Sequence, residues 1–243
     1  MNKDLKLLKQ DEHYYGEAGK KYLSASGIKT LLTNPAAFGK DQEDTKAMMQ
    51  GRLFHQMVLQ PELDLTVPIV NASSRNTKMY KETLEDSGLP FMFLSHEIDE
   101  VRGWVNVILS NFRFYEAIRA EGNLFEQPAI GEIGGEMFKG KADIVTDSEI
   151  IDLKTTGDIN SFHWNARKYG YDTQAYIYNC LFSKPMRFYV LCKETLQLGI
   201  FKTSPQFIEQ GKHNTEAGIE VYRKYFKKGH TEDIIDHVIE ETL

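Results

Sequence analysis

The chain has 243 residues, of which 41% are hydrophobic, 26% charged and 12% aromatic, and this ordinary globular composition argues against disordered, fibrous and membrane-spanning classes. Its 29 Lys and Arg face 35 Asp and Glu, so the formal net charge of −6 argues against a protein that coats nucleic acid by bulk positive charge. An enzyme that binds nucleic acid in one focused cleft is still compatible with this charge.

Neither a signal peptide nor a membrane anchor is expected. Charges interrupt the first residues, Met1 to Lys6, and no later segment approaches the ~18 apolar residues of a membrane span. We therefore expect a cytoplasmic location and no membrane partner. The two cysteines, Cys180 and Cys192, lie among apolar neighbours and are expected to be buried reduced thiols. Two cysteines are too few for a four-cysteine zinc site or iron–sulfur cluster, so neither is expected.

The first half of the chain, residues 1–121, has mostly helical patterns. A short helix over 27–32 follows Ser26, which could cap it, and stops at Asn34-Pro35. The later elements expected here are a helix over 44–59, an extended segment over 65–70, and helices over 76–86, 97–109 and 112–120.

The pattern changes to strands at residue 122. Runs over 125–133, 136–146 and 149–154 are separated by the turn pairs Gly134-Gly135 and Asp147-Ser148, which predicts a three-stranded meander. The elements expected next are a long helix over 161–182 broken or weakened at Gly170, a hairpin of 187–192 with 197–202, and helices over 205–228 and 232–241. We predict a single α/β domain over 1–243, with helical parts at 1–121 and 205–243 around an α/β core at 122–204.

A group of acidic and basic side chains stands out in the meander. Side chains alternate along a strand, so Asp152 and Lys154 share one face, about 6.6 Å apart, while Leu153 faces the other way. Pairing of the preceding strand could bring the carboxylate of Asp143 next to that of Asp152. Adjacent carboxylates repel unless a proton or cation joins them, and oxygen ligands of this kind suit Mg²⁺ or Mn²⁺. Lys154 could then stabilise charge on a phosphate or orient a water molecule.

Two alternatives accompany this interpretation. An isolated Asp-x-Lys is most often a salt bridge on a solvated sheet face, and it is the nearby acids and a helix histidine that favour a site here. The segment from Gly135 to Lys141 also fits the phosphate-binding pattern G-x-x-x-x-G-K. However, position 142 is Ala, which has no hydroxyl for Mg²⁺, and the chain continues as a strand, so ATP is not expected.

Taken together, the motifs resemble the PD-(D/E)XK nuclease superfamily, in particular its exonuclease VIII (RecE-like) and RecB-like branch of bacteria and phages. The motifs that carry the resemblance, in order, are Tyr22-Leu23-Ser24-Ala25-Ser26, Asn34-Pro35, Gly51-Arg52-Leu53-Phe54-His55, Glu126, Gly140-Lys141-Ala142-Asp143, Ile151-Asp152-Leu153-Lys154-Thr155-Thr156 and Tyr169-Gly170-Tyr171-Asp172-Thr173-Gln174-Ala175-Tyr176-Ile177-Tyr178. The resemblance implies a restriction-endonuclease-like core, a mixed central sheet flanked by helices. It also implies a phage or prophage origin.

The resemblance assigns metal ligands. Asp143 and Asp152 would bind the divalent cation with the backbone carbonyl of Leu153, and His55 would be the additional ligand of the RecB-like branch. Glu126 would bind the metal directly or through water, and Lys154 is the signature lysine. Without the resemblance, His55 would be interpreted as a helix histidine packed on apolar neighbours, and Glu126 as a solvated strand residue.

Further residues are implied to contact DNA or support the site. Gln174 and Tyr178 form the family's Q-x-x-x-Y signature on one helix face, where Tyr171 also lies; the alternative is a packed aromatic helix. The remaining candidates, for phosphate contacts, are Arg52, Ser24 and Ser26, although Ser26 equally fits a helix cap.

The implied activity is Mg²⁺-dependent hydrolysis of linear double-stranded DNA from the 5′ end, with Mn²⁺ as a substitute metal. The 3′ single strand left behind would serve an annealing partner of the RecT type, and the enzyme would be a ring-shaped homo-oligomer. One rival is another RecB-like nuclease, such as the CRISPR-adaptation type, which usually has four cysteines. The others are a noncatalytic DNA-binding or assembly subunit, which would be expected to have lost a site residue, and a metal-binding regulator.

Overall fold

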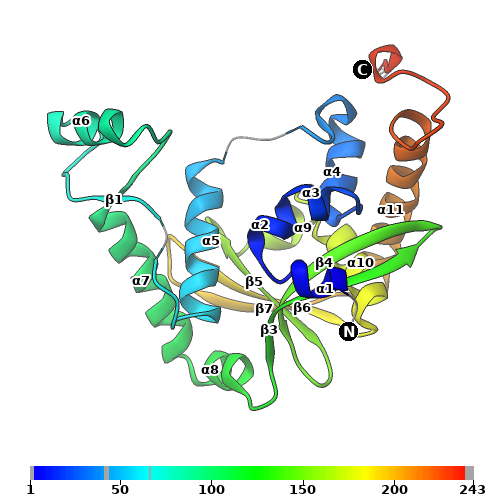
Figure 1. The fold of residues 1–243 in the computed structure, drawn as a ribbon. Coiled ribbons are helices and arrows are strands. Elements are labelled where there is room, and N and C mark those ends of the chain that lie inside the picture. The colour runs from blue at the N-terminus through cyan, green and yellow to red at the C-terminus, as the bar shows by residue number, and fades with distance from the viewer. Residues whose placement is uncertain (1–2, 41–43, 66, 239–243) are drawn as a thin grey trace.

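A five-stranded mixed sheet forms the centre of the computed structural model, which describes residues 3–40, 44–65 and 67–238 (Figure 1). The strands, in their order across the sheet, are β3 (Leu124–Ile133), β4 (Glu136–Val145), β5 (Ile150–Thr156), β6 (Met186–Cys192) and β7 (Leu198–Lys202). Only β5 and β6 are parallel, and the other neighbours are antiparallel. The expected α/β class, with a mixed sheet flanked by helices, is confirmed.

The predicted meander and its turns are also found. Gly134 and Gly135 join β3 to β4 with φ values of +58° and +78°, a conformation that favours glycine and suits a two-residue hairpin. The hairpin of β6 with β7 is present as well. The parallel β5 and β6 need a crossover, and two helices between them provide it.

Helices cover both faces of the sheet (Figure 1). One face packs on α5 (Lys46–Leu59), α7 (Ser95–Ser110) and α8 (Phe112–Arg119). The other face packs on α4 (Ala25–Thr33), α9 (Phe162–Lys168), α10 (Tyr171–Phe182) and α11 (Pro205–Tyr225). Ile151 and Leu153 enter the first of these cores and Ile150 the second, so β5 is buried on both sides and any polar residue on it needs a partner.

Short elements complete the fold. They are α1 (Lys3–Leu7), α2 (Asp11–Tyr15), α3 (Glu17–Lys20), the 3₁₀ turn η1 (Pro35–Ala37), β1 (Ile69–Val70), α6 (Lys78–Ser87), β2 (Phe93–Leu94) and the 3₁₀ turn η2 (Ile234–Asp236). The helices α1 to α3 and strand β2 were not predicted, because four- or five-residue helices and two-residue strands show no period. Of the extended segment over 65–70, only β1 pairs, in parallel with β2.

Several expectations are refined or corrected. The pattern over 161–182 forms two helices, and the break lies at Gly170, one of the two alternatives expected there, because Gly170 adopts φ +75° at the junction. The helix expected over 232–241 is wrong within the described residues, where only η2 forms; residues 239–241 lie outside them. Cys180 is exposed on α10 rather than buried, while Cys192 is buried as expected, and both are free thiols.

In the described part of the chain, no helix is both long and apolar enough to cross a membrane.

Candidate metal centre

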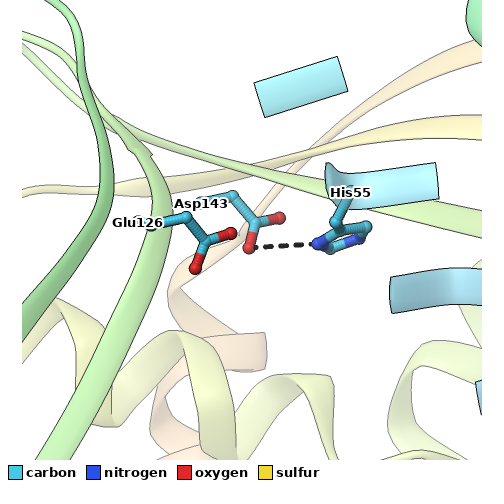
Figure 2. Close-up of side chains that lie close together, drawn as sticks. All are labelled: His55, Glu126 and Asp143. Atoms are coloured by element: carbon cyan, nitrogen blue, oxygen red, sulfur yellow. Dashed lines mark ion pairs between the residues drawn. The ribbon is translucent and has the colours of Figure 1, made fainter. Parts of the chain in front are cut away.

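Three side chains from three different elements meet at one end of the sheet. His55 comes from α5, Glu126 from β3 and Asp143 from β4, and one ligand atom from each lies within 4.8 Å of the others (Figure 2). Asp143 is buried, while the other two are half-buried. One imidazole nitrogen and two carboxylates are a donor set that binds divalent cations.

Asp143 stands where β4 and β5 separate. The backbones of β4 and β5 pair where Ile144 faces Ile151. One residue before Ile144, the side-chain carboxylate of Asp143 takes the place of the backbone hydrogen bond between the strands. Its Oδ2 accepts from the backbone N–H of Leu153 at 2.7 Å. Asp143 therefore satisfies a free donor of β5 with one oxygen and keeps the other, Oδ1, toward His55.

Glu126 is held in a strained backbone conformation. Its φ is +50°, which is uncommon for any residue with a side chain, and the pairs Phe125–Ile144 and Gln127–Ala142 of β3 and β4 flank it while Glu126 itself is unpaired in the ladder. Lys141 of β4 lies 3.1 Å from Glu126 Oε2, and its ammonium also pairs with Asp11 of α2. The strain thus coincides with a carboxylate turned into the cluster, as occurs at functional sites.

His55 reaches the cluster from α5, whose first turn is capped by the side chain of Thr45. The ring Nε2 lies 2.9 Å from the carbonyl oxygen of Leu153, to which it donates, and Nδ1 is 3.4 Å from Asp143 Oδ1. Burial lowers the pKa of His55, but the charge and hydrogen bonding of Asp143, together with the charge of Asp152, more than offset it and the net shift is upward. Because Nε2 donates to Leu153, the lone pair of Nδ1 faces the carboxylate of Asp143. The two repel each other unless a proton or a cation lies between them, so this geometry suits a metal ion.

Asp152 lies beside the cluster of three rather than in it. Its Oδ1 accepts from Nε2 of Gln174 at 2.7 Å, and its Oδ2 lies 2.6 Å from the ammonium of Lys154. Oδ2 is fully buried, and among the described residues the ammonium of Lys154 is its counter-charge. Burial raises the pKa of the Asp152 carboxyl to about 6, against the opposing effect of Lys154. Burial lowers the pKa of Lys154, but Asp152, Tyr171 and Asp143 together more than offset burial, so the pKa rises and Lys154 stays charged.

The acidic groups repel one another. Burial raises the pKa of Glu126, and Asp143 adds to this effect against the attraction of Lys141. Burial also opposes ionisation of Asp143, but His55 and the Leu153 N–H more than offset it, and the net shift of its pKa is downward. The group closest to His55 therefore carries the charge, and a bound cation would relieve the remaining repulsion.

A divalent cation fits these residues. The clustered nitrogen and oxygen donors and the mutual repulsion of Glu126 and Asp143 both favour a positive charge at this place. The carbonyl oxygen of Leu153 accepts from His55, which places it in the same region, and it has a second lone pair.

The two signature residues of α10, Gln174 and Tyr178, contact different strands. Gln174 holds Asp152, whereas Tyr178 is 8% exposed and its hydroxyl bonds the backbone of Lys141, accepting from N–H at 3.2 Å and donating to C=O at 2.9 Å. Tyr178 therefore supports the strand that carries Asp143. The ring of Tyr171 lies under Lys154, with 4.8 Å from Nζ to the ring centroid.

The three candidate phosphate contacts have partners outside the cluster in the described structure. Arg52 pairs with Asp44 on the surface. Ser24, not Ser26, is the cap of α4: its side chain accepts from the N–H of Gly27 at 3.2 Å, so α4 begins two residues earlier than predicted. The hydroxyl of Ser26 lies 3.1 Å from that of Ser24.

Lys141 and Asp11 were not predicted as parts of the site. Lys139, Lys141 and Asp143 alternate along β4 and share a face, a signal that the sequence contains. The pairing of Lys141 with Asp11 of α2, far away in the chain, has no local signal. The G-x-x-x-x-G-K segment runs along β4 as a strand, not as a phosphate-binding loop before a helix.

Comparison with known proteins gives matches consistent with this geometry. The sequence model of the family described as PDDEXK-like domain of unknown function (DUF3799) matches residues 24–233. A crystal structure from Eubacterium rectale, described as that of a "putative exonuclease", superposes with a TM-score of 0.66 at 17% identity, over 96% of this chain and 95% of that chain. The structure of SSO0001 has a TM-score of 0.33 at 16% identity, over 81% of this chain and 84% of that one, too low to support an argument. No curated protein matches the sequence.

Proposed function

Since the chain belongs to the family of PDDEXK-like domains described as DUF3799, we propose that it is a nuclease that uses a divalent metal to hydrolyse the phosphodiester bonds of DNA. The resemblance to the PD-(D/E)XK superfamily noted in the sequence is thereby confirmed, and the fold agrees with it.

The observation that carries the proposal is the cluster of His55, Glu126 and Asp143 beside a buried Asp152–Lys154 pair. A noncatalytic relative would not need to keep buried acids that repel one another, because each costs stability without a cation. The same cost argues against the solvated salt bridge as the explanation of Asp152 and Lys154, since Asp152 is only 1% exposed.

Each group of site residues has its own role in this proposal. His55, Glu126, Asp143, Asp152 and the carbonyl of Leu153 would hold Mg²⁺, for which Mn²⁺ can substitute. When bound, the cation lowers the pKa of water and stabilises the departing oxygen. Lys154, charged and held in place by Asp152, would stabilise the negative charge that grows on the phosphate. Gln174 keeps Asp152 oriented.

The finer proposal concerns the substrate. We propose an exonuclease of the RecE-like branch that degrades linear duplex DNA from 5′ to 3′, in the cytoplasm of a bacterial cell. The resulting 3′ single strand would pass to a RecT-like annealing protein, and a ring-shaped homo-oligomer would enclose the DNA. Support comes from the ordered motifs and from likeness to a structure described as an exonuclease.

Linear duplex DNA labelled at either the 5′ or the 3′ end tests both the nuclease proposal and the finer exonuclease proposal. With Mg²⁺ the wild type should release the 5′ label first, and EDTA, Asp152→Ala or Lys154→Ala should abolish release. Undiminished digestion by either variant would refute the site. Digestion from 3′ ends, or of single strands alone, would reject the RecE-like branch and keep the nuclease. Light scattering tests the ring, which a monomer at working concentration would exclude.

A further inference from the structure

Two segments of this acidic chain contain no Asp or Glu. One runs from Ala18 to Lys40 and includes α4, and the other runs from Ile159 to Tyr171, through α9 to the start of α10. The second segment carries several aromatic residues, Phe162, Trp164, Tyr169 and Tyr171, together with Arg167 and Lys168. Basic residues interleaved with aromatic ones are typical of surfaces that bind single-stranded nucleic acid.

The fold brings these two segments together. The ammonium of Lys29 on α4 lies 5.5 Å from the ring centroid of Tyr169, which follows α9. A β-carbon at Gly170 would lie 3.6 Å from the side chain of Lys29, so the junction of α9 and α10 packs directly on α4. Figure 1 shows α4, α9 and α10 on the same side of the sheet.

A row of side chains leads from this junction to Lys154. The rings of Tyr169 and Tyr171 lie 5.9 Å apart, and Lys154 Nζ is 4.8 Å from the ring centroid of Tyr171. Tyr171 is half-buried against Phe162 and Phe188, whereas Tyr169 is 48% exposed. The row thus begins at Lys154 and ends at the exposed ring of Tyr169, beside the half-buried Lys29.

Local folding alone gives Tyr169 little reason to be aromatic. Tyr169 is 48% exposed, and a cation–π contact at an exposed site contributes only about 0.5–1 kcal/mol. The left-handed Gly170 ends α9 directly after Tyr169 and starts α10 at Tyr171, so both rings lie at the turn instead of along a helix.

We propose that Lys29, Tyr169 and Tyr171 form a stacking surface for single-stranded DNA, over which the terminal nucleotides of the cut strand reach Lys154. A base stacks on the exposed ring of Tyr169, Lys29 pairs with a phosphate, and the half-buried Tyr171 forms the inner end of the surface beside Lys154. This inference rests on the proposed nuclease function. It adds that the enzyme holds the end of that strand unpaired before hydrolysis.

Binding of a fluorescent oligothymidine to the wild type in EDTA, followed by anisotropy, tests the surface without hydrolysis. Tyr169→Ala should weaken binding about tenfold, the effect of one lost base stack, and Tyr169→Phe should retain binding. Tyr115→Ala is the matched control, because Tyr115 is 49% exposed on α8 across the sheet and should leave binding unchanged. Lys29→Met should reduce the slope of log affinity against log salt by about 0.7, the share of one phosphate, and Lys81→Met on α6 should not.

The outcomes separate the two claims. Equal binding by Tyr169→Ala and Tyr115→Ala, with both folded by circular dichroism, overturns the stacking surface whether or not DNA is cut. Absence of Mg²⁺-dependent hydrolysis by the wild type overturns the nuclease instead. In a hydrolysing enzyme, Tyr169→Ala should raise KM for blunt duplex DNA about tenfold with kcat little changed. A thermal shift with unaltered oligothymidine binding would show a merely structural role and refute the proposal.

Discussion

Replacing Gln174 with Met probes the least obvious part of the candidate site. The amide of Gln174 does not belong to the ligand cluster, but its Nε2 donates to Asp152 Oδ1 at 2.7 Å. Asp152 is 1% exposed, so no water can readily replace the lost donor. Methionine has similar length and flexibility and keeps the packing of α10, so the change isolates the hydrogen bond.

The size of the effect follows from the kind of bond. A hydrogen bond to a charged group contributes about 1.5–3 kcal/mol, and about 1.4 kcal/mol corresponds to a tenfold change in an equilibrium constant. Metal binding needs the ionised Asp152, so the affinity for a divalent cation should fall about 10- to 100-fold, the usual loss when a residue that orients a ligand is changed.

The pH dependence has a definite sign. Burial raises the pKa of Asp152 to about 6, so the carboxyl takes up a proton and metal affinity falls as the pH drops below that value. Gln174 donates to the ionised form and thereby favours it. Its removal raises the pKa further, and the loss of metal affinity should begin at a higher pH than in the wild type.

Calorimetric titration with Mn²⁺ between pH 5 and 8 measures both effects, and the Mg²⁺ concentration for half-maximal hydrolysis gives a second readout. Gln210→Met is the control, because Gln210 is exposed on α11 and bonds only Asn214 among the described residues. If Gln174→Met titrates like Gln210→Met at every pH, the role assigned to Gln174 is wrong.

Three further predictions concern other polar contacts of the protein. Lys141→Met should weaken Mn²⁺ binding about tenfold in calorimetry, because Glu126 loses the ammonium 3.1 Å away that favours its ionised form; unchanged binding would exclude Glu126 as a ligand. Glu97→Gln should lower the free energy of unfolding by about 2–4 kcal/mol in urea, since buried Glu97 accepts two bonds from Arg75. That difference should be fully present above pH ~4.5 and shrink toward pH 2, because the pKa of Glu97 is lowered to about 2 by these bonds against burial; a constant difference would contradict it. Tyr178→Phe should cost about 1–3 kcal/mol of stability by losing two bonds to the β4 backbone, and an unchanged melting temperature would refute this.

Most of the central sheet could be predicted because its signals are local. Alternation placed Asp152 and Lys154 on one face and Leu153 in the core, and the glycine pair at 134–135 marked the hairpin. These features depend on the two-residue period of strands and on left-handed turns, which a single sequence displays.

Parts of the site that depend on tertiary contacts could not be predicted. Asp11 pairs with Lys141 although the two residues lie 130 positions apart in the chain. The positive φ of Glu126 arises where β3 crosses the site, and no glycine marks it. Similarly, Ser24 and Ser26 are both suitable residue types for a helix cap. Only the backbone conformation of the folded chain shows that Ser24 is the cap.

The central claim is that the cluster of His55, Glu126 and Asp143 holds the metal that hydrolyses DNA. The most direct measurement compares Mg²⁺-dependent nucleotide release from linear duplex DNA by the wild type and by Asp143→Asn, which keeps the size of the side chain and removes its charge. We predict steady release by the wild type and none above the EDTA background for a folded Asp143→Asn. Equal release by both proteins would contradict the account.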